Sequence, residues 1–400
     1  MTDNGIILAI NAGSSSVKFA AFRPDFDRTL SGMLEGIGSR PRLRASVLGM
    51  ETVEDWSDAG ADNVPDLIRR LIAWIEARNA AGGLRAIGHR VAIGGLDHSG
   101  PVLITPDVMR HLAALVPLAP LHQPRNLEPI EILATSHPDM PQVACFDTAF
   151  HRTLPREART YGLPRTITQA GAQRYGFHGL SYEYIAGRLA GCDARAASGR
   201  TIVCHLGSGA SLCALRAGQS VETTMGFSPL SGLVMATRSG DLDPGLMLWL
   251  LRERGMSVTE LERMLYHDSG LKGVSGLGGD MRALLASDDP AAEEAVALFV
   301  YRVATEIGRL TAALGGLDAL VFTAGIGEHS AEIRARISDR CGWLGLKLST
   351  AANRSGSQRI SGTGSDVTAW VIPTDEERMV AQHTARLAGA RQTAGQGVFT

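Results

Sequence analysis

The sequence has few cysteines and no long apolar run. Five cysteines are spread over 400 residues, and this odd number at wide spacing excludes a disulfide framework and a clustered zinc site. No uninterrupted apolar stretch reaches the ~20 residues that a membrane-spanning helix needs. No basic segment precedes the short apolar stretch at the N-terminus, so a signal peptide is not expected. These absences predict a reducing, cytoplasmic location and no membrane partner.

Neither sign of charge dominates the sequence. Thirty-nine Lys and Arg stand against 41 Asp and Glu, a net charge of -2, so nucleic acid is not expected as a partner. Hydrophobic residues make up 44% and charged residues 20%, which is ordinary for a soluble globular protein. The length exceeds one average hydrophobic core and predicts two domains.

Short β-branched runs alternate with helical patterns along the chain. The apolar spacing of residues 65–77 predicts a helix with one buried face. Asp243 and Asp289 each precede a proline, which is the pattern of a helix N-cap. The second of these predicts a helix of about 25 residues that ends at Gly315-Gly316. Strands are predicted at 6–10, 17–22, 142–147, 201–206 and 319–324. This mixture predicts an α/β architecture.

One arrangement occurs twice. INAGSSSVKFAAF (10–22) and CHLGSGASLCALRAG (204–218) both read as strand, Gly/Ser turn and strand. A Walker loop or a Rossmann fingerprint would need a helix after the glycines, so both are disfavoured. A single hairpin of this kind is an ordinary turn. The pair indicates a duplicated fold with a phosphate held between the halves.

Several segments offer groups for phosphoryl transfer, which needs positive charge, a metal and an aligned acceptor. The first hairpin provides backbone N–H groups, hydroxyls and Lys18, with Asn11 at the strand end where its oxygen could reach a metal. Arg90 lies in an apolar segment, where an arginine is costly unless it faces an anion. With Arg238 it would form a two-arginine clamp. The alternatives are a solvated Lys18 and an internal salt bridge for Arg90.

Carboxylates and histidines in other segments are further candidates for the site. Asp147 comes at the end of a strand, where α/β proteins keep their sites, although such an aspartate is as often a cap. His122 and His178 lie among prolines and glycines, and either could be structural. Asp375, Glu376 and Glu377 begin a helix, where at least one is expected to be a cap. Residues 322–334 predict a strand, a glycine turn and a helix whose N–H groups suit an anion.

Taken together, these segments resemble the acetate kinase (acetokinase) family, which includes propionate kinases. The resemblance covers residues 6 to about 388, and its motifs occur in the family's order. They are INAGSSSVK, GHRV, PLH-P-N, FDTAFH, RYGFHG, HLG-GAS, MGF-PL-GL-M-TRSGD-DPG, DMR, FTAGIGE and PT-EE.

The resemblance implies a duplicated, ribonuclease H-like fold shared with actin and hexokinase, with an interdomain cleft. Residues 1–147 plus 376–400 would form one lobe, and residues 148–375 a second lobe with the nucleotide site. It further implies ATP-dependent phosphorylation of acetate or propionate to the acyl phosphate and ADP. The reaction would be reversible and in-line, with Mg²⁺ or alternatively Mn²⁺, in a homodimer.

The resemblance also implies a role for each matching residue. Asn11 and Glu376 would position the metal, and Arg90, Ala92 and His122 would bind the carboxylate substrate. Asp147, His178 and Arg238 would be catalytic. The nucleotide would contact Ser14, Ser16, Lys18, His205, Leu206, Gly207, Ser208, Gly209, Asp280, Met281, Arg282, Gly325, Ile326, Gly327, Glu328 and His329.

The sequence departs from the family's usual pattern at several of these motifs. Ser208 and His329 each replace an asparagine, which leaves the nucleotide preference open. Leu180 and Tyr182 replace threonine and histidine in HGLSY, and Ala92-Ile93 replaces valine and histidine. The smaller Ala92 predicts room for about one extra methylene, so propionate would be used at least as well as acetate and butyrate less well, unless Ile93 or Leu180 fills the gap. A propionate-preferring kinase of the same family is the alternative. A sugar or glycerol kinase and a non-catalytic, actin-like nucleotide-binding protein are the alternative functions.

Overall fold

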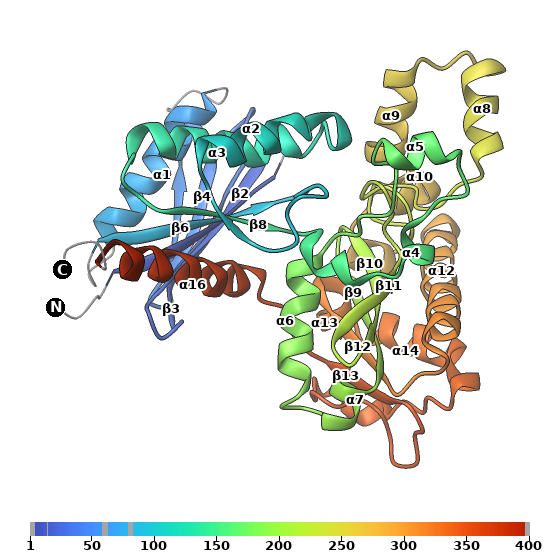
Figure 1. Ribbon diagram of the computed structural model, residues 1–400. Helices are drawn as coiled ribbons and strands as arrows, with labels where there is room; N and C mark the ends of the chain where they lie inside the picture. Colours follow the sequence, from blue (N-terminus) through green and yellow to red (C-terminus); the bar gives the residue numbers. More distant parts are fainter. Residues whose placement is uncertain (1–4, 14, 58–62, 79–82, 397–400) are drawn as a thin grey trace. The chain divides into compact units, whose positions relative to one another are not determined.

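The computed structural model describes residues 5–13, 15–57, 63–78 and 83–396. They form two compact units, Met1–Ala149 with Asp375–Thr400, and Phe150–Thr374. Each unit contains one mixed β-sheet with helices on its faces (Figure 1). Among the described residues, no helix combines the length and the apolar character needed to cross a membrane.

The first unit contains a sheet of eight strands. Its order is β5 (Met50–Asp55), β4 (Arg42–Val47), β3 (Arg28–Glu35), β2 (Ser16–Phe22), β1 (Ile6–Ala12), β6 (Leu84–Val91), β8 (Gln142–Phe146) and β7 (Val102–Leu103). β1 pairs antiparallel with β2 and parallel with β6, and β6 pairs parallel with β8. The carboxyl ends of β1, β6 and β8 therefore share one edge.

Helices cover this sheet on both faces. α1 (Val64–Arg78) packs its buried face against strand residues such as Leu8 and Ile10. α2 (Pro106–Ala114), η2 (Val116–Leu118) and α3 (Gln123–Ser136) follow in the chain. The long C-terminal helix α16 (Glu376–Gln396), red in Figure 1, lies against the blue strands of this unit. Gly88 permits its close approach, since a Cβ there would lie 2.1 Å from Thr384 Oγ1.

The second unit repeats this topology. Its sheet has the order β11 (Gln219–Thr223), β10 (Ala210–Arg216), β9 (Arg200–Leu206), β12 (Ala319–Thr323) and β13 (Thr368–Val371). β9 pairs antiparallel with β10 and parallel with β12, as β1 does with β2 and β6. This repetition confirms the predicted duplicated α/β fold.

Helices of the second unit cover both faces of its sheet. α6 (Gly179–Leu189) packs on one face and α12 (Pro290–Leu314) on the other (Figure 1). The remaining elements are η3 (Ala149–Thr153), α4 (Arg156–Arg159), α5 (Arg165–Gln169), α7 (Ala194–Ser198), α8 (Pro244–Arg252), α9 (Val258–His267), α10 (Gly270–Ser275), α11 (Met281–Leu285), α13 (Ala324–His329), α14 (Ala331–Arg340), η4 (Gly342–Leu344) and α15 (Thr350–Arg354).

The predicted helix signals are confirmed, with one correction. Asp243 and Asp289 accept N–H groups at the starts of α8 and α12, and α12 ends at Gly315, whose φ is 70°. The segment after β12 is not a glycine turn. It is the short helix α13, which begins at Ala324 in a left-handed conformation with φ 63°. Glu328 stabilises this start because its Oε1 accepts the Ala324 N–H at 2.7 Å.

Candidate active site

Arg90 and Asp147 form a buried pair at the edge of the first sheet. Arg90 Nε donates to Asp147 Oδ1 at 3.1 Å, and its Nη2 donates to Oδ2. Arg90 Nη1 donates to Asn11 Oδ1 at 3.1 Å. The Asp147 side chain is 1% exposed and that of Arg90 22%. The ends of β1, β6 and β8 thus bring three predicted site residues together. The pair is an internal salt bridge that leaves part of the guanidinium open to an anion.

The carboxylates at the start of α16 have different partners. Asp375 Oδ1 accepts the Arg378 N–H at 3.1 Å and an N–H of Arg28 at 2.6 Å, so the cap is Asp375. Glu377 lies 3.9 Å from Lys18 Nζ. Because Asp375 caps the helix, Glu376 and Glu377 are available for another role.

Glu376 lies in an unfavourable electrostatic position. Burial raises the pKa of Glu376, Arg90 partly lowers it, and Asp147 and Glu377 raise it further, to about 7. Burial alone would lower the pKa of Arg90, but the charges of Asp147 and Glu376 raise it above its ordinary value. Three carboxylates therefore lie near one partly buried arginine, and a cation would relieve their repulsion.

These donors fit a magnesium ion. No group of three or more His, Cys, Asp or Glu side chains in the described part of the chain is arranged to hold a metal. Mg²⁺ does not need one, because it keeps several waters and takes one or two carboxylates. Glu376, Glu377 and Asn11 line one small pocket and supply the oxygen donors that Mg²⁺ prefers.

Two amide side chains hold the segment that follows Arg90. Asn126 Oδ1 accepts the Ala92 N–H at 2.9 Å, and Asn126 Nδ2 donates to the Ala12 carbonyl at 2.7 Å. Gln123 contacts the Ile93 backbone through both ends of its amide, at 3.3 and 3.0 Å. Ala92 and Ile93 are both buried. Sequence reasoning missed these amides, although two uncharged polar residues on a buried helix face were a usable signal.

Three other predicted site residues of the first unit lie before α3 and on β2. His122 is half-buried and directly precedes α3. Lys18 is 60% exposed on β2, so much of its side chain is solvated. Ser16 begins β2, and its carbonyl accepts the Gly13 N–H at 2.8 Å. Ser14 lies outside the described residues. The roles predicted for these residues stay predictions.

The second unit contains a cavity of about 950 Å³. Its wall combines the β9–β10 turn, the start of α11 and helices α13 and α14. The predicted nucleotide residues that line it are Gly207, Ser208, Asp280, Met281, Arg282, Gly325, Ile326 and His329. The other predicted nucleotide residues of this unit, His205, Leu206, Gly209, Gly327 and Glu328, are not in this wall. Sequence reasoning missed Leu285, Ala286, Ala331 and Glu332 in the wall, since only the fold places them there.

His178 and Arg238 converge on Gly209. A Cβ placed on Gly209 would lie 3.0 Å from Arg238 Nη2 and 3.4 Å from His178 Nε2. His178 has a left-handed φ of 59° directly before α6. Its ring stacks on His205 with centroids 4.1 Å apart. Arg238 Nη1 donates to the Pro229 carbonyl at 2.7 Å. The absence of a side chain at Gly209 lets the guanidinium of Arg238 and the imidazole of His178 both approach the backbone at this position.

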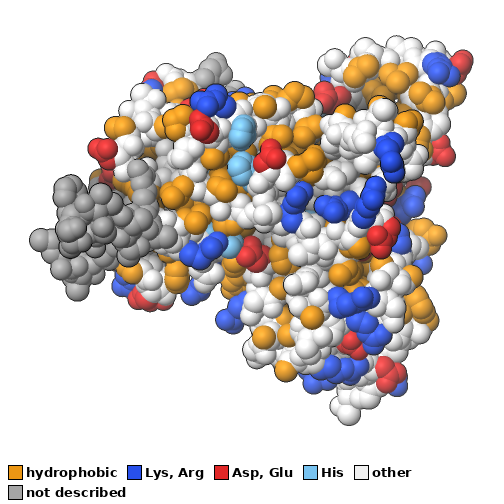
Figure 2. Space-filling model, in the orientation of Figure 1, with side chains coloured by type: hydrophobic (Ala, Val, Ile, Leu, Met, Phe, Trp, Pro, Cys, Tyr) orange, Lys and Arg blue, Asp and Glu red, His pale blue; other side chains and the backbone are white. Residues whose placement is uncertain are grey.

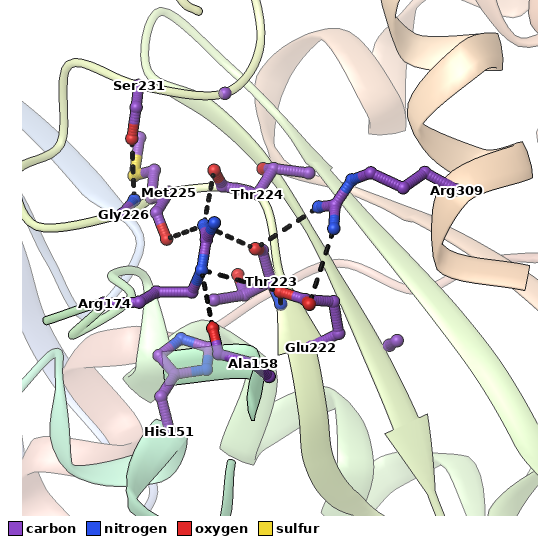
Figure 3. Close-up of polar contacts among 12 residues, drawn as sticks. His151, Ala158, Arg174, Glu222, Thr223, Thr224, Met225, Gly226, Ser231 and Arg309 are labelled. Atoms are coloured by element: carbon purple, nitrogen blue, oxygen red, sulfur yellow. Dashed lines mark hydrogen bonds and ion pairs between the residues drawn. The ribbon is translucent and has the colours of Figure 1, made fainter. Parts of the chain in front are cut away.

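Arg174, which lies shortly before α6, hydrogen-bonds to backbone carbonyls at the end of β11 and just after it (Figure 3). Its Nη1 donates to the carbonyls of Thr223, Thr224 and Met225 at 3.0, 3.2 and 3.0 Å. Glu222 balances its charge, 3.6 Å from Arg174 and 3.5 Å from Arg309. Sequence reasoning missed this arginine, because its carbonyl partners lie about 50 residues away.

Comparison with known proteins agrees with these features. The acetokinase family matches residues 6–382 of this chain. Acetate kinases of Rhodopseudomonas palustris and Rhizobium meliloti are each 51% identical over 96% of this chain and 98% of their own length. A propionate kinase structure from Francisella tularensis has a TM-score of 0.91 and 36% identity, covering 96% of this chain and 100% of that chain. A Porphyromonas gingivalis acetate kinase structure has a TM-score of 0.86 and 32% identity, covering 96% and 99%. The chain therefore belongs to the acetokinase family and is an enzyme, a kinase of that family.

Proposed function

We propose that this enzyme transfers the γ-phosphoryl group of ATP to a short-chain carboxylate, reversibly, and forms the acyl phosphate and ADP. The observation that carries the proposal is Arg90, a guanidinium aligned by a buried Asp147 and still partly exposed. Such a cation suits an anionic acceptor better than the hydroxyl of a sugar or glycerol.

The first unit would bind the acceptor and the metal. Acetate is already ionised at neutral pH, so no base is required, and Asp147 serves to orient Arg90. The guanidinium would hold the carboxylate and offset the charge that remains on its oxygens. Glu376, with Asn11 and Glu377 nearby, would hold Mg²⁺, which on binding would neutralise phosphate charge.

The second unit would bind the nucleotide and stabilise the moving group. The 950 Å³ cavity is large enough for a nucleotide. Gly209 leaves space beside it for the phosphoryl group, with Arg238 as a fixed cation and His178 as an N–H donor. Preorganised donors of this kind stabilise charge that spreads over the transferring oxygens. An arginine in this position can contribute roughly 10³–10⁵ in rate.

The acyl preference follows from the segment after Arg90. Ala92 is smaller than the valine usual in the family, and Ile93 beside it is fully buried. We propose that propionate is used at least as well as acetate, since burying one methylene is worth ~0.8 kcal/mol. Butyrate should be poorer because the backbone of this segment is held by Asn126 and Gln123.

A homodimer is proposed from the surface of the second unit. Helix α8 has no buried residue, although it is rich in large apolar side chains. Leu246, Leu248 and Trp249 are 41%, 49% and 46% exposed. Hydrophobic side chains gather over the region of α8 and α9 at the upper right of Figure 2. Apolar surface concentrated in this way usually marks an interface. The mass in solution, measured by light scattering, tests this proposal.

One assay tests the proposed reaction. ATP, Mg²⁺ and hydroxylamine are incubated with formate, acetate, propionate, butyrate or glycerol, and the acyl hydroxamate is measured. Hydroxamate with acetate and propionate, and no ADP release with glycerol, is expected. ADP release with glycerol alone would favour the sugar or glycerol kinase, and no turnover with any acceptor would favour the non-catalytic alternative.

A further inference from the structure

Tyr182 contacts the catalytic candidate His178 through one serine. Tyr182 is fully buried in α6, and its backbone N–H donates to the His178 carbonyl at 3.1 Å. The Tyr182 hydroxyl lies 2.5 Å from Ser211 Oγ. Ser211 Oγ lies 2.8 Å from His178 Nδ1. Ser211 is itself buried on β10. These side chains form a continuous hydrogen-bonded series that ends on the imidazole.

The direction of these hydrogen bonds decides where His178 carries its proton. Either hydroxyl can be the donor in the bond between Tyr182 and Ser211, and the more acidic phenol O–H of Tyr182 is favoured in that role. With Tyr182 as the donor, Ser211 has its single hydrogen left for His178 Nδ1, which then accepts it. A neutral imidazole has one N–H, which is therefore on Nε2. Nε2 is the atom that faces Gly209 beside Arg238.

The stacked partner His205 shows the same arrangement. The Thr374 hydroxyl donates to Ser181 Oγ at 2.8 Å, and Ser181 Oγ lies 2.8 Å from His205 Nδ1. Ser181 therefore has its own hydrogen available for Nδ1. In each of these two neighbouring histidines, Nδ1 is hydrogen-bonded to a serine, and that serine is hydrogen-bonded to a second hydroxyl group.

We propose that Tyr182, acting through Ser211, is a positioning residue that keeps the proton of His178 on Nε2. The inference rests on the proposed function for its consequence, because an Nε2–H donor is what a phosphoryl oxygen beside Arg238 requires. It concerns this chain in particular, since Tyr182 stands where the acetokinase family usually has a histidine. Without the phenol, Ser211 can turn and accept from Nδ1–H, and the two tautomers become mixed.

The kinetic test uses Tyr182→Phe, which removes one hydroxyl and keeps the ring. The kcat for acetate and propionate should fall about tenfold, the worth of one hydrogen bond, while KM for ATP and carboxylate stays within about twofold. Tyr175→Phe is the matched control, because it removes another buried tyrosine hydroxyl, bonded to the Gly171 carbonyl at 2.9 Å. Ser211→Ala combined with Tyr182→Phe should be no slower than Ser211→Ala alone, since the hydroxyls act in series.

A spectroscopic test is independent of turnover. In ¹⁵N-histidine-labelled protein, long-range ¹H–¹⁵N spectra identify the protonated ring nitrogen, and a His178→Gln variant assigns the signals. We expect His178 to be protonated at Nε2 in the unmodified enzyme and to show mixed tautomers in Tyr182→Phe but not in Tyr175→Phe. An unchanged Nε2–H signal in Tyr182→Phe, or equal kcat losses in the two phenylalanine variants, would overturn the proposal. A protein with no kinase activity but the expected tautomer shift would refute the proposed function and leave the positioning intact.

Discussion

Replacing Glu376 with glutamine should stabilise the protein at pH 8 while abolishing its stabilisation by Mg²⁺. The pKa of Glu376 is raised from 4.5 to about 7, first by burial and then by Asp147 and Glu377, against the opposing effect of Arg90. Between these values the folded protein keeps a proton that the unfolded chain has released. The free energy of unfolding therefore falls as the pH rises through this window.

The size of the effect follows from the interval between the two pKa values. At about 1.4 kcal/mol per pKa unit it amounts to about 3 kcal/mol above pH 7, and solvent screening of this half-buried side chain reduces it to about 2 kcal/mol. At pH 5 only about a quarter remains. In a unit of this size about 2 kcal/mol raises the Tm by roughly 4–8 °C.

Differential scanning calorimetry in EDTA measures this at pH 5 and pH 8. Glu376→Gln should melt roughly 4–8 °C above the unmodified protein at pH 8 and within about 2 °C of it at pH 5. Adding MgCl₂ at pH 8 should raise the Tm of the unmodified protein only, since a metal that binds the folded state stabilises it. Glu128→Gln is the control, because Glu128 is a partly exposed glutamate in an ion pair with Arg125.

Two results would refute this reasoning. If Glu376→Gln melts at or below the temperature of the unmodified protein at pH 8, the carboxylate is not held in an unfavourable position. If MgCl₂ stabilises the variant as strongly as the unmodified protein, Glu376 is not a metal ligand. The same test on Glu377→Gln then decides whether the second glutamate binds the metal instead.

Four further substitutions test other parts of the proposed site. Arg90→Ala and Arg238→Ala should each lower kcat at least ~10³-fold with a normal circular dichroism spectrum. Arg90→Ala should also raise KM for the carboxylate. Near-normal turnover in either variant would remove that residue from the mechanism. Gly209→Ala should lower kcat roughly 10²-fold, because a Cβ would enter the space between Arg238 and His178. Gly187→Ala, whose Cβ would meet nothing within 4 Å, is its control and should leave kcat unchanged. Ala92→Val should shift kcat/KM toward acetate, and a tenfold acetate preference in the unmodified enzyme would contradict the pocket argument.

Local signals in the sequence predicted several strands, some of the helix ends and the repeated topology. The strands at 6–10 and 201–206 and both Gly/Ser hairpins are present as β1–β2 and β9–β10. Asp289 caps the start of α12 and Gly315 caps its end. Both were predictable because capping depends on residues within a turn of the helix end. Helix α13 was not predicted, because its glycine-rich sequence is typical of a turn. A side chain four positions later, Glu328, satisfies its first N–H group.

Only the tertiary structure decided which polar side chains are partners. The sequence contains Arg90, Asp147 and Asn11 as separate candidates, but parallel pairing of β1, β6 and β8 places their ends at one edge and joins them by hydrogen bonds. Asp375 rather than Glu376 caps α16, because Asp375 lies where it can accept the Arg378 N–H. The raised pKa of Glu376 depends on burial and on charges that are distant in sequence. Such effects fall off with distance in space and not along the chain, so no local pattern could have predicted them.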